Sequence, residues 1–241
     1  MQNQDFHLHH SHKEEHFTGS ETIRDIVIGM SDGLTVPFAL AAGLSGAVSD
    51  NWIVVTAGVA EIIAGSIAMG LGGYLAGKTE YDHYFSELKR EYEETVTKPE
   101  AEKQEIREVL GEYGISPETR ELVVEELSQN RDKWVEFMMK FELGLEEPHL
   151  NRARKSAAVI AGSYIAGGFV PLLPYLFTET PEEGLLYSIF ITLAALFAFG
   201  FFKSKATGQP PFMGALKTMA IGAVAAGAAF LIAKAIGGGE G

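Results

Sequence analysis

Two acidic side chains lie inside runs of residues that are otherwise apolar. Asp32 falls within the run 26–48, and Glu61 falls within the run 52–77. An ionised side chain in the middle of a bilayer costs at least about 3 kcal/mol, so such residues are usually kept for an ion or proton path. Met69 follows Glu61 by eight residues. Carboxylate and thioether groups along one membrane path predict passage of a divalent cation, with protons competing for the carboxylates.

Each of these residues also has a structural interpretation. Asp32 stands in the triplet 31–33, Ser-Asp-Gly, where it could simply cap a helix that breaks there. Met69 could fill space between helices, which is the commoner role of methionine. Glu61 has no turn-forming neighbours, so a structural role for it requires a buried partner.

A second group of acidic residues and methionines lies between the second and third apolar runs. Glutamates three residues apart share one helix face, as do residues three or four apart near position 140. If these faces meet, their carboxylates suit divalent ions and their thioethers shift the preference toward Fe²⁺. The alternative is that the glutamates are solvated and the methionines fill a core. The predicted metal-binding set is Glu91, Glu94, Glu102, Glu105, Met138, Met139 and Glu142.

Two further groups of polar residues precede the first apolar run. Glu21 and Asp25 are one helical turn apart and would either line the cytosolic mouth of a path or form a solvated helix end. Residues 1–20 are predicted to be a disordered, histidine-rich tail, with weak metal binding as the alternative. Its imidazoles are His7, His9, His10, His12 and His16.

Five apolar segments must position these residues. A helix needs about 20 apolar residues to cross the hydrocarbon core. The sequence therefore predicts an all-α, polytopic membrane protein with five transmembrane helices. The expected domains are residues 21–77 with the first two transmembrane helices, residues 78–150 with an acidic, metal-binding helical insert, and residues 151–241 with the last three transmembrane helices. The expected spans are 24–48, 52–77, 155–177, 184–202 and 212–236.

The insert between the second and third spans has a different composition. Residues 78–150 hold 20 Asp or Glu and 10 Lys or Arg, which is −10 of the net charge of −13. Three helices are expected there: a continuation of the second span to about Val96, a helix ending near Tyr113, and one from Ser116 to about Leu143. The first span should be kinked at 31–33 and at Pro37.

Charge and composition also set limits on partners and topology. Basic residues fall on one side of the predicted spans, which places the N-terminus and the insert in the cytosol and the C-terminus on the far side. The N-terminus lacks the apolar core of a cleaved secretory signal. A basic nucleic-acid footprint is missing, so no nucleic-acid partner is expected. With no cysteine, thiolate metal sites and Fe–S clusters are excluded, and no prosthetic group is expected.

The longest motifs resemble one known family. SDGLTVPFALAAGLSG in the first span, AEIIAGSIAMGLGGYLAGKTE in the second and PLLPY in the third are similar to the vacuolar iron transporter family of plants and fungi. The resemblance covers nearly the whole chain. Shorter relatives of the nodulin-like type lack the insert, and this chain has it.

The resemblance implies a homodimer in the vacuolar membrane that exchanges cytosolic Fe²⁺ for protons in iron homeostasis. Asp32 and Met69 of both subunits would coordinate the ion at the dimer interface, with Glu61 nearby for metal or proton transfer. Glu21 and Asp25 would line the entrance. The insert's glutamates and methionines match the family's metal-binding set, whereas nothing carries over to the histidine tail.

Two other functional classes share parts of this sequence pattern. A membrane-anchored metal buffer or sensor would use the insert alone, but a simple tether does not need Asp32 and Glu61. A di-iron oxidase typically uses paired Glu-x-x-His motifs on facing helices. The insert has Glu80-x-x-His83 at its membrane end, and His149 follows Glu146 by three only beyond Pro148, so the motif is single and not paired on helices. The chain is therefore expected not to be an enzyme. Its ligands would also accept Mn²⁺, Co²⁺ or Zn²⁺.

Overall fold

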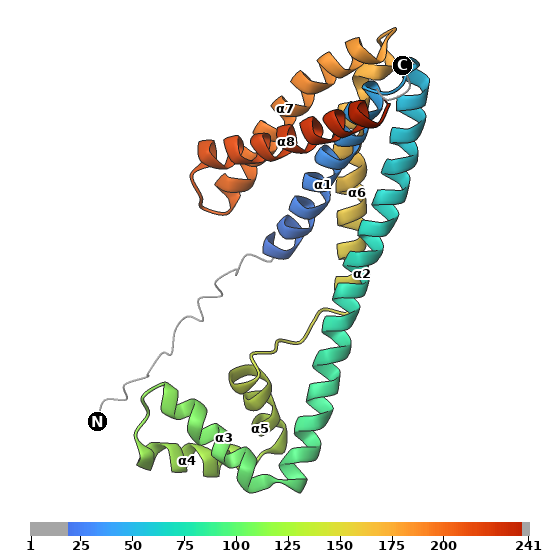
Figure 1. Cartoon of the computed structure of the whole chain (residues 1–241). Helices are drawn as coiled ribbons and strands as arrows, with labels where there is room; N and C mark the ends of the chain where they lie inside the picture. The colour runs from blue at the N-terminus through green and yellow to red at the C-terminus, as the bar shows by residue number, and fades with distance from the viewer. Residues whose placement is uncertain (1–18, 238–241) are drawn as a thin grey trace, which may run out of the picture. The chain divides into compact units, whose positions relative to one another are not determined.

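The computed structural model describes residues 19–237, with side chains from Glu21 onward (Figure 1). The predicted histidine tail lies almost wholly outside the described residues. Within them the chain is all-α. The elements are α1 (Gly19–Ser45), α2 (Asn51–Thr97), α3 (Pro99–Glu112), α4 (Pro117–Ser128), α5 (Arg131–Phe137), a π-helix (Met138–Glu142), α6 (Arg152–Leu172), a 3₁₀ turn (Leu173–Leu176), α7 (Pro181–Ala206) and α8 (Pro211–Gly237).

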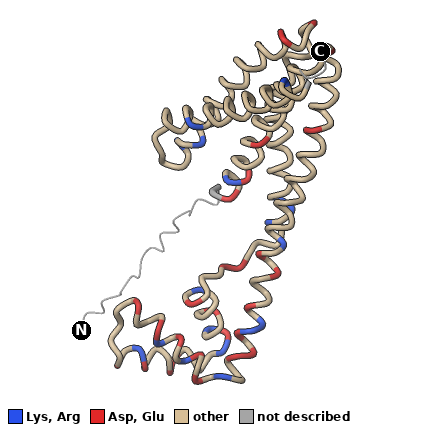
Figure 2. Tube along the Cα trace, in the orientation of Figure 1, with Lys and Arg blue, Asp and Glu red and all other residues tan. Residues whose placement is uncertain are grey.

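Five of these helices, α1, α2, α6, α7 and α8, are long and apolar enough to cross a membrane, which confirms the predicted number of spans. Figure 2 shows few charged positions along α7, α8 and the first part of α2, whereas charges crowd the second half of α2 and the helices that follow it up to α6. Near Pro171 and Pro174, α6 gives way to the 3₁₀ turn, within the predicted third span of 155–177. Proline cannot donate the backbone hydrogen bond that would continue the helix.

The chain divides into two compact units. One contains the residues up to Gly70 and those from Ala158 onward, and the other contains Leu71–Ala157. In the first unit α1 packs against α7 and α8, and these two pack against each other. Its main core joins Val54 and Ile62 of α2 to Leu172 and Tyr175.

The first span shows no helix break at 31–33, and the kink expected there and at Pro37 stays a prediction. α1 is continuous from Gly19 to Ser45 and contains Pro37 within it. Within this continuous helix, Gly33 lets the backbone of α6 approach closely. A Cβ atom at Gly33 would lie 2.3 Å from the carbonyl oxygen of Tyr164. Asp32 therefore lies in mid-helix and does not cap a break.

The second unit contains the insert. Its first two predicted helices are confirmed, because α2 continues to Thr97 and α3 ends at Glu112. The predicted single third helix is wrong, since it is divided into α4, α5 and the π-helix. Asn130 adopts an extended backbone conformation and accepts a hydrogen bond from the Lys133 N–H, which starts α5 as a new helix.

Candidate functional site

One of the two membrane carboxylates is held by a tyrosine. The Tyr164 hydroxyl on α6 donates a hydrogen bond to Oε1 of Glu61 on α2, with an oxygen–oxygen distance of 2.5 Å. The carboxylate of Asp32 on α1 also interacts electrostatically with the Tyr164 phenol. Tyr164 is thus the buried partner that a structural role of Glu61 would require, and it does not by itself decide between that role and a place in the path.

Close backbone packing positions this tyrosine. Gly33 of α1 lies against the Tyr164 backbone, and Gly65 of α2 leaves room for its ring, since a Cβ there would lie 2.4 Å from the hydroxyl oxygen. Gly29 of α1 contacts the carbonyl of Ile160 in the same manner. Glycines four residues apart let membrane helices approach closely, so this spacing holds α6 against α1.

Glu61 has an unsatisfied atom beside an apolar groove. Its Oε2 is buried and has no hydrogen-bond partner in the described part of the chain. The groove has a volume of about 500 Å³ and is lined by Glu61, by α1 residues such as Val36 and Ala39, and by α8 residues such as Ala229. A buried carboxylate oxygen without a donor is costly unless a cation or proton is there to meet it.

The other predicted membrane residues occupy separate positions. Met69 is half-buried and lies eight residues after Glu61, or about 12 Å along the helix axis, so the two do not share one ion within a single chain. Near the start of α1, Glu21 is exposed, whereas Asp25 is only 2% exposed. The interpretation as a solvated helix end therefore fits Glu21 but not Asp25.

The insert brings its five predicted glutamates together. Glu102 interacts electrostatically with Glu91, Glu94 and Glu105. Glu142 of the π-helix interacts with the same neighbours. Glu91 and Glu102 are each 2% exposed and their carboxyl groups are hydrogen-bonded to each other, which requires a shared proton.

Burial raises the proton affinity of this cluster. Loss of solvation, followed by the negative charges of Glu105 and Glu91, raises the pKa of Glu102 to about 8. The same causes raise the pKa of Glu142 to about 7. Carboxylates ionise less readily when they are desolvated and surrounded by like charges. The cluster therefore holds protons near neutral pH that a bound metal ion would have to displace.

Arg90 is a resident cation that sequence reasoning missed. Its guanidinium lies 2.7 Å from Glu87, 3.5 Å from Glu91 and 3.4 Å from Glu94. The i,i+4 spacing to Glu94 is visible in the sequence and could have revealed it. Within the described residues, no three His, Asp or Glu side chains are arranged as a ready metal site. Metal binding would thus require rearrangement around Arg90.

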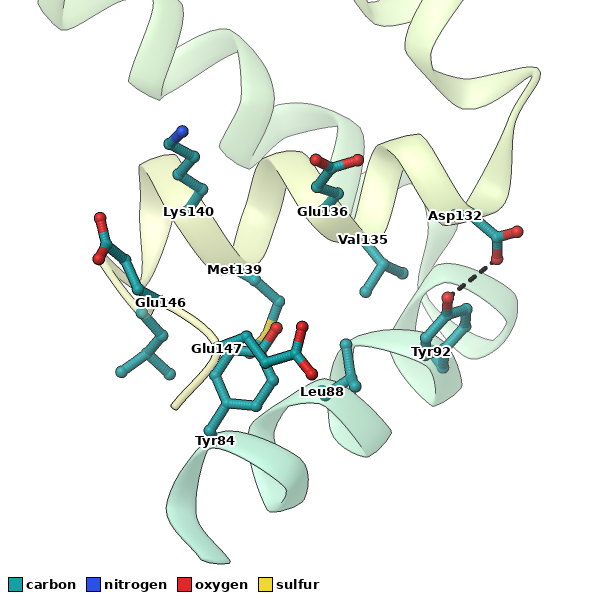
Figure 3. Close-up of a pocket in the computed structure, with 11 residues that line it drawn as sticks. Tyr84, Leu88, Tyr92, Asp132, Val135, Glu136, Met139, Lys140, Glu146 and Glu147 are labelled. Carbon is teal, nitrogen blue, oxygen red and sulfur yellow. Dashed lines mark hydrogen bonds between the residues drawn. The ribbon is translucent and has the colours of Figure 1, made fainter. Parts of the chain in front are cut away.

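The two methionines of the insert have different surroundings. Met138 is fully buried in the core with Ile106, Leu110 and Trp134. Met139 instead faces a separate pocket of about 360 Å³, with Tyr84 and other side chains drawn in Figure 3. The Tyr92 hydroxyl closes one end of this pocket by donating to Asp132 at 2.9 Å.

The π-helix sets the direction of these side chains. The Leu143 N–H donates to the carbonyl of Met138, five residues back, at 3.0 Å. A π turn places its side chains differently from an α turn and often marks functional sites. Here the turn presents Glu142 to the glutamate cluster although Met138 remains in the core. Nothing in the sequence pattern predicted it.

Comparisons with known proteins agree with this architecture. A family model described as the VIT family matches residues 23–234. The chain is 53% identical to "Vacuolar iron transporter 1" of Oryza sativa subsp. japonica over 95% of this chain and 91% of the relative. It is 54% identical to "Vacuolar iron transporter 1" of Arabidopsis thaliana over 93% and 90%. It is 41% identical to "Protein CCC1" of Saccharomyces cerevisiae over 89% and 69%. By these matches the chain belongs to the VIT family, a family of transporters and not of enzymes.

Proposed function

We propose that this chain is a transporter of the vacuolar membrane that moves Fe²⁺ from the cytosol into the vacuole in exchange for protons. The names of its relatives support the cargo and the organelle. Five long apolar helices support membrane insertion. The observation that carries the proposal is Glu61, held by Tyr164 at 2.5 Å and left with a second oxygen that has no partner among the described residues.

Exchange follows from the chemistry of carboxyl groups. A carboxylate binds a dication only after it has lost its proton, so metal and proton compete for the same oxygen atoms. At the cytosolic side, where protons are scarce, Asp32 and Glu61 would take Fe²⁺. At the acidic side, protons would return to them and release the ion. Met69 would add a softer ligand that suits Fe²⁺.

The complete path is proposed to lie between two copies of the chain. Ala64 and Ala68 of α2 are exposed in the single chain, on the ridge of small residues that leads toward Gly72. Such a ridge allows a second helix to approach closely. At a two-fold axis, α1 and α2 of both copies would contribute Asp32 and Met69 to one ion.

The insert is proposed to collect the ion on the cytosolic side. Its glutamate cluster carries negative charge that attracts cations, and Glu21 and Asp25 would line the entrance to the path. Arg90 would be displaced when the ion arrives, which is feasible because its side chain is 50% exposed. Met139 and the core residue Met138 would join the ligands only if the π-helix shifts.

Uptake into proteoliposomes tests the transport proposal. The full chain should accumulate Fe²⁺ when the interior is acidic, with protons moving outward, and should slow when the gradient is collapsed. Replacing Asp32 with Ala should abolish uptake, whereas the loop substitution Asp50→Ala should not affect it. Uptake that ignores the pH gradient would replace exchange with a channel mechanism, and unchanged uptake in Asp32→Ala would remove Asp32 from the path.

The same experiment separates the transporter from a membrane-anchored metal buffer. A buffer would bind Fe²⁺ through the insert and give no accumulation inside vesicles. Asp32→Ala should retain the binding of Fe²⁺ by the insert while losing flux, because Asp32 lies in the other compact unit. Binding without any flux in the unaltered chain would favour the buffer.

A further inference from the structure

A pocket lined by basic and neutral polar side chains lies where the apolar stretch of α2 ends. It has a volume of about 370 Å³ and lies wholly within the second compact unit. Gly77 of α2 and Ala153 of α6 form its base, where a Cβ at Gly77 would lie 2.8 Å from the Cα of Ala153. The polar side chains that line it are Tyr74, Lys78, Tyr81, His149, Asn151 and Arg154.

The charge of this pocket contrasts with that of its surroundings. Residues 78–150 carry a net charge of −10, yet no Asp or Glu is among the residues that line the pocket. Lys78 makes an ion pair with Asp82 at 2.5 Å, but both side chains are exposed and such pairs are weak. Lys78 is therefore available to a stronger anionic partner.

Arg154 is placed where a cation is unfavourable. It is exposed, lies in the first turn of α6 and makes no ion pair or hydrogen bond through its side chain with other described residues. The first turn of α6 contains no acidic residue. Because the N-terminal end of a helix carries partial positive charge, a cation there is destabilised unless an anion comes close. An external anion would satisfy both the guanidinium and the helix end.

The pocket lies at the expected level of the membrane surface. Between Asn51 and Lys78 the only charged residue of α2 is Glu61, a stretch of about 40 Å at 1.5 Å per residue. Lys78 is thus the first charge beyond the hydrocarbon core. Tyrosines gather at this level because their rings suit the headgroup region. Leu150, at the rim of the pocket, is 83% exposed, as suits a side chain that dips into lipid.

We propose that this pocket binds the phosphate-bearing headgroup of an anionic phospholipid. The planar guanidinium of Arg154 matches two phosphate oxygens, and Lys78 adds a second positive charge. The Tyr81 hydroxyl and Asn151 amide supply neutral donors. Basic pockets at the cytoplasmic ends of membrane helices are suited to such lipids. This site is separate from the membrane carboxylates and from the glutamate cluster, and it goes beyond the transport proposal.

Thermal unfolding of the detergent-solubilised full chain tests the site. A short-chain phosphatidylinositol phosphate should raise the melting temperature in a saturable manner, and short-chain phosphatidylcholine should not. The double substitution Lys78→Gln/Arg154→Gln should weaken the apparent affinity about tenfold or more, as expected when charged hydrogen bonds are lost. Arg154→Gln alone should weaken it less. The matched control Lys203→Gln/Lys205→Gln removes the same charge from the end of α7 and should bind as the unaltered chain does.

Three results would overturn the proposal. The first is unchanged lipid affinity in the double variant, provided that its melting temperature without lipid shows it to be folded. The second is an equal loss in the α7 control, which would indicate general attraction between charges and no defined pocket. The third is binding of inorganic phosphate or free inositol phosphate as tightly as the lipid, which would make the ligand a soluble anion.

Discussion

The hydroxyl of Tyr164 and the carboxylate of Glu61 are hydrogen-bonded at 2.5 Å across 103 positions of sequence, and this contact ties α6 to α2. Glu61 thereby gains a donor inside an apolar bundle, where an unpaired carboxylate is costly. The contact leaves Oε2 of Glu61 unpartnered within the described residues. One oxygen is thus fixed in place while the other is available to a proton or an ion.

Replacing Tyr164 with Phe should slow Fe²⁺ uptake by about tenfold, because a hydrogen bond to a charged group contributes about 1.5–3 kcal/mol. Initial uptake rates in proteoliposomes at several external pH values would measure the effect. Tyr187→Phe is the matched control, since Tyr187 is an exposed tyrosine of α7. Equal rates for Tyr164→Phe and the unaltered chain would show that Glu61 works without its donor.

Metal-free protein should lose stability as the pH rises through the range set by Glu102. Its pKa is raised from 4.5 to about 8 in the fold, so the folded chain holds a proton that the unfolded chain releases. That contribution is fully present below pH 4.5 and is lost as the pH approaches 8. The melting temperature should therefore fall from pH 5 to pH 8, and Glu102→Gln should flatten the decline.

The control for this measurement is Glu125→Gln, which changes an exposed glutamate of α4. It should leave the pH dependence of the melting temperature as it is in the unaltered chain. If Glu102→Gln has the same slope as this control, the raised pKa of Glu102 does not contribute to stability.

Gly33→Ala should destabilise the first unit by about 1–3 kcal/mol, the usual effect of overpacking a close contact. The added methyl group would lie 2.3 Å from the backbone oxygen of Tyr164, so the helices must separate. Gly227→Ala is the matched control, because nothing lies within 4 Å of a Cβ at Gly227. Melting temperatures in detergent would compare the two, and equal values would mean that α1 and α6 can move apart without loss.

Ala68→Leu should disrupt the proposed dimer while leaving the single chain folded. Ala68 is exposed, so a larger side chain meets nothing within the chain but blocks close approach by a second α2. Light scattering of the purified protein would report the mass. Ala228→Leu, on an exposed position of α8, should remain dimeric. A dimer that survives Ala68→Leu would place the interface elsewhere.

The sequence predicted the parts of the fold that depend on length and composition. Five spans follow from apolar runs, and the start of α4 follows from Ser116, whose side chain accepts a hydrogen bond from the Thr119 N–H. The division of the third insert helix escaped prediction because Asn130 is compatible with a helix interior as well as with a cap. Whether Asn130 caps a new helix or continues the old one depends on how α5 packs in the folded insert.

The membrane carboxylates were found from their rarity in apolar runs, but their partner was not. A tyrosine in an apolar span such as that of Tyr164 is common, and only tertiary packing brings it to Glu61. The alternative of a helix break capped by Asp32 is not observed, for a related reason. Glycine permits both a turn and a close helix contact, and the local sequence does not distinguish them. The glutamates of the insert were grouped from spacing, whereas Arg90 among them was overlooked.

The π-helix at Met138–Glu142 has a consequence for how chain length varies among relatives. Its wider turn accommodates one residue more than a regular helix does. In a relative that lacks one residue of this turn, the side chain equivalent to Glu142 would point in a different direction, even if every acidic residue were retained. In this stretch, a one-codon deletion would therefore be more damaging than most substitutions.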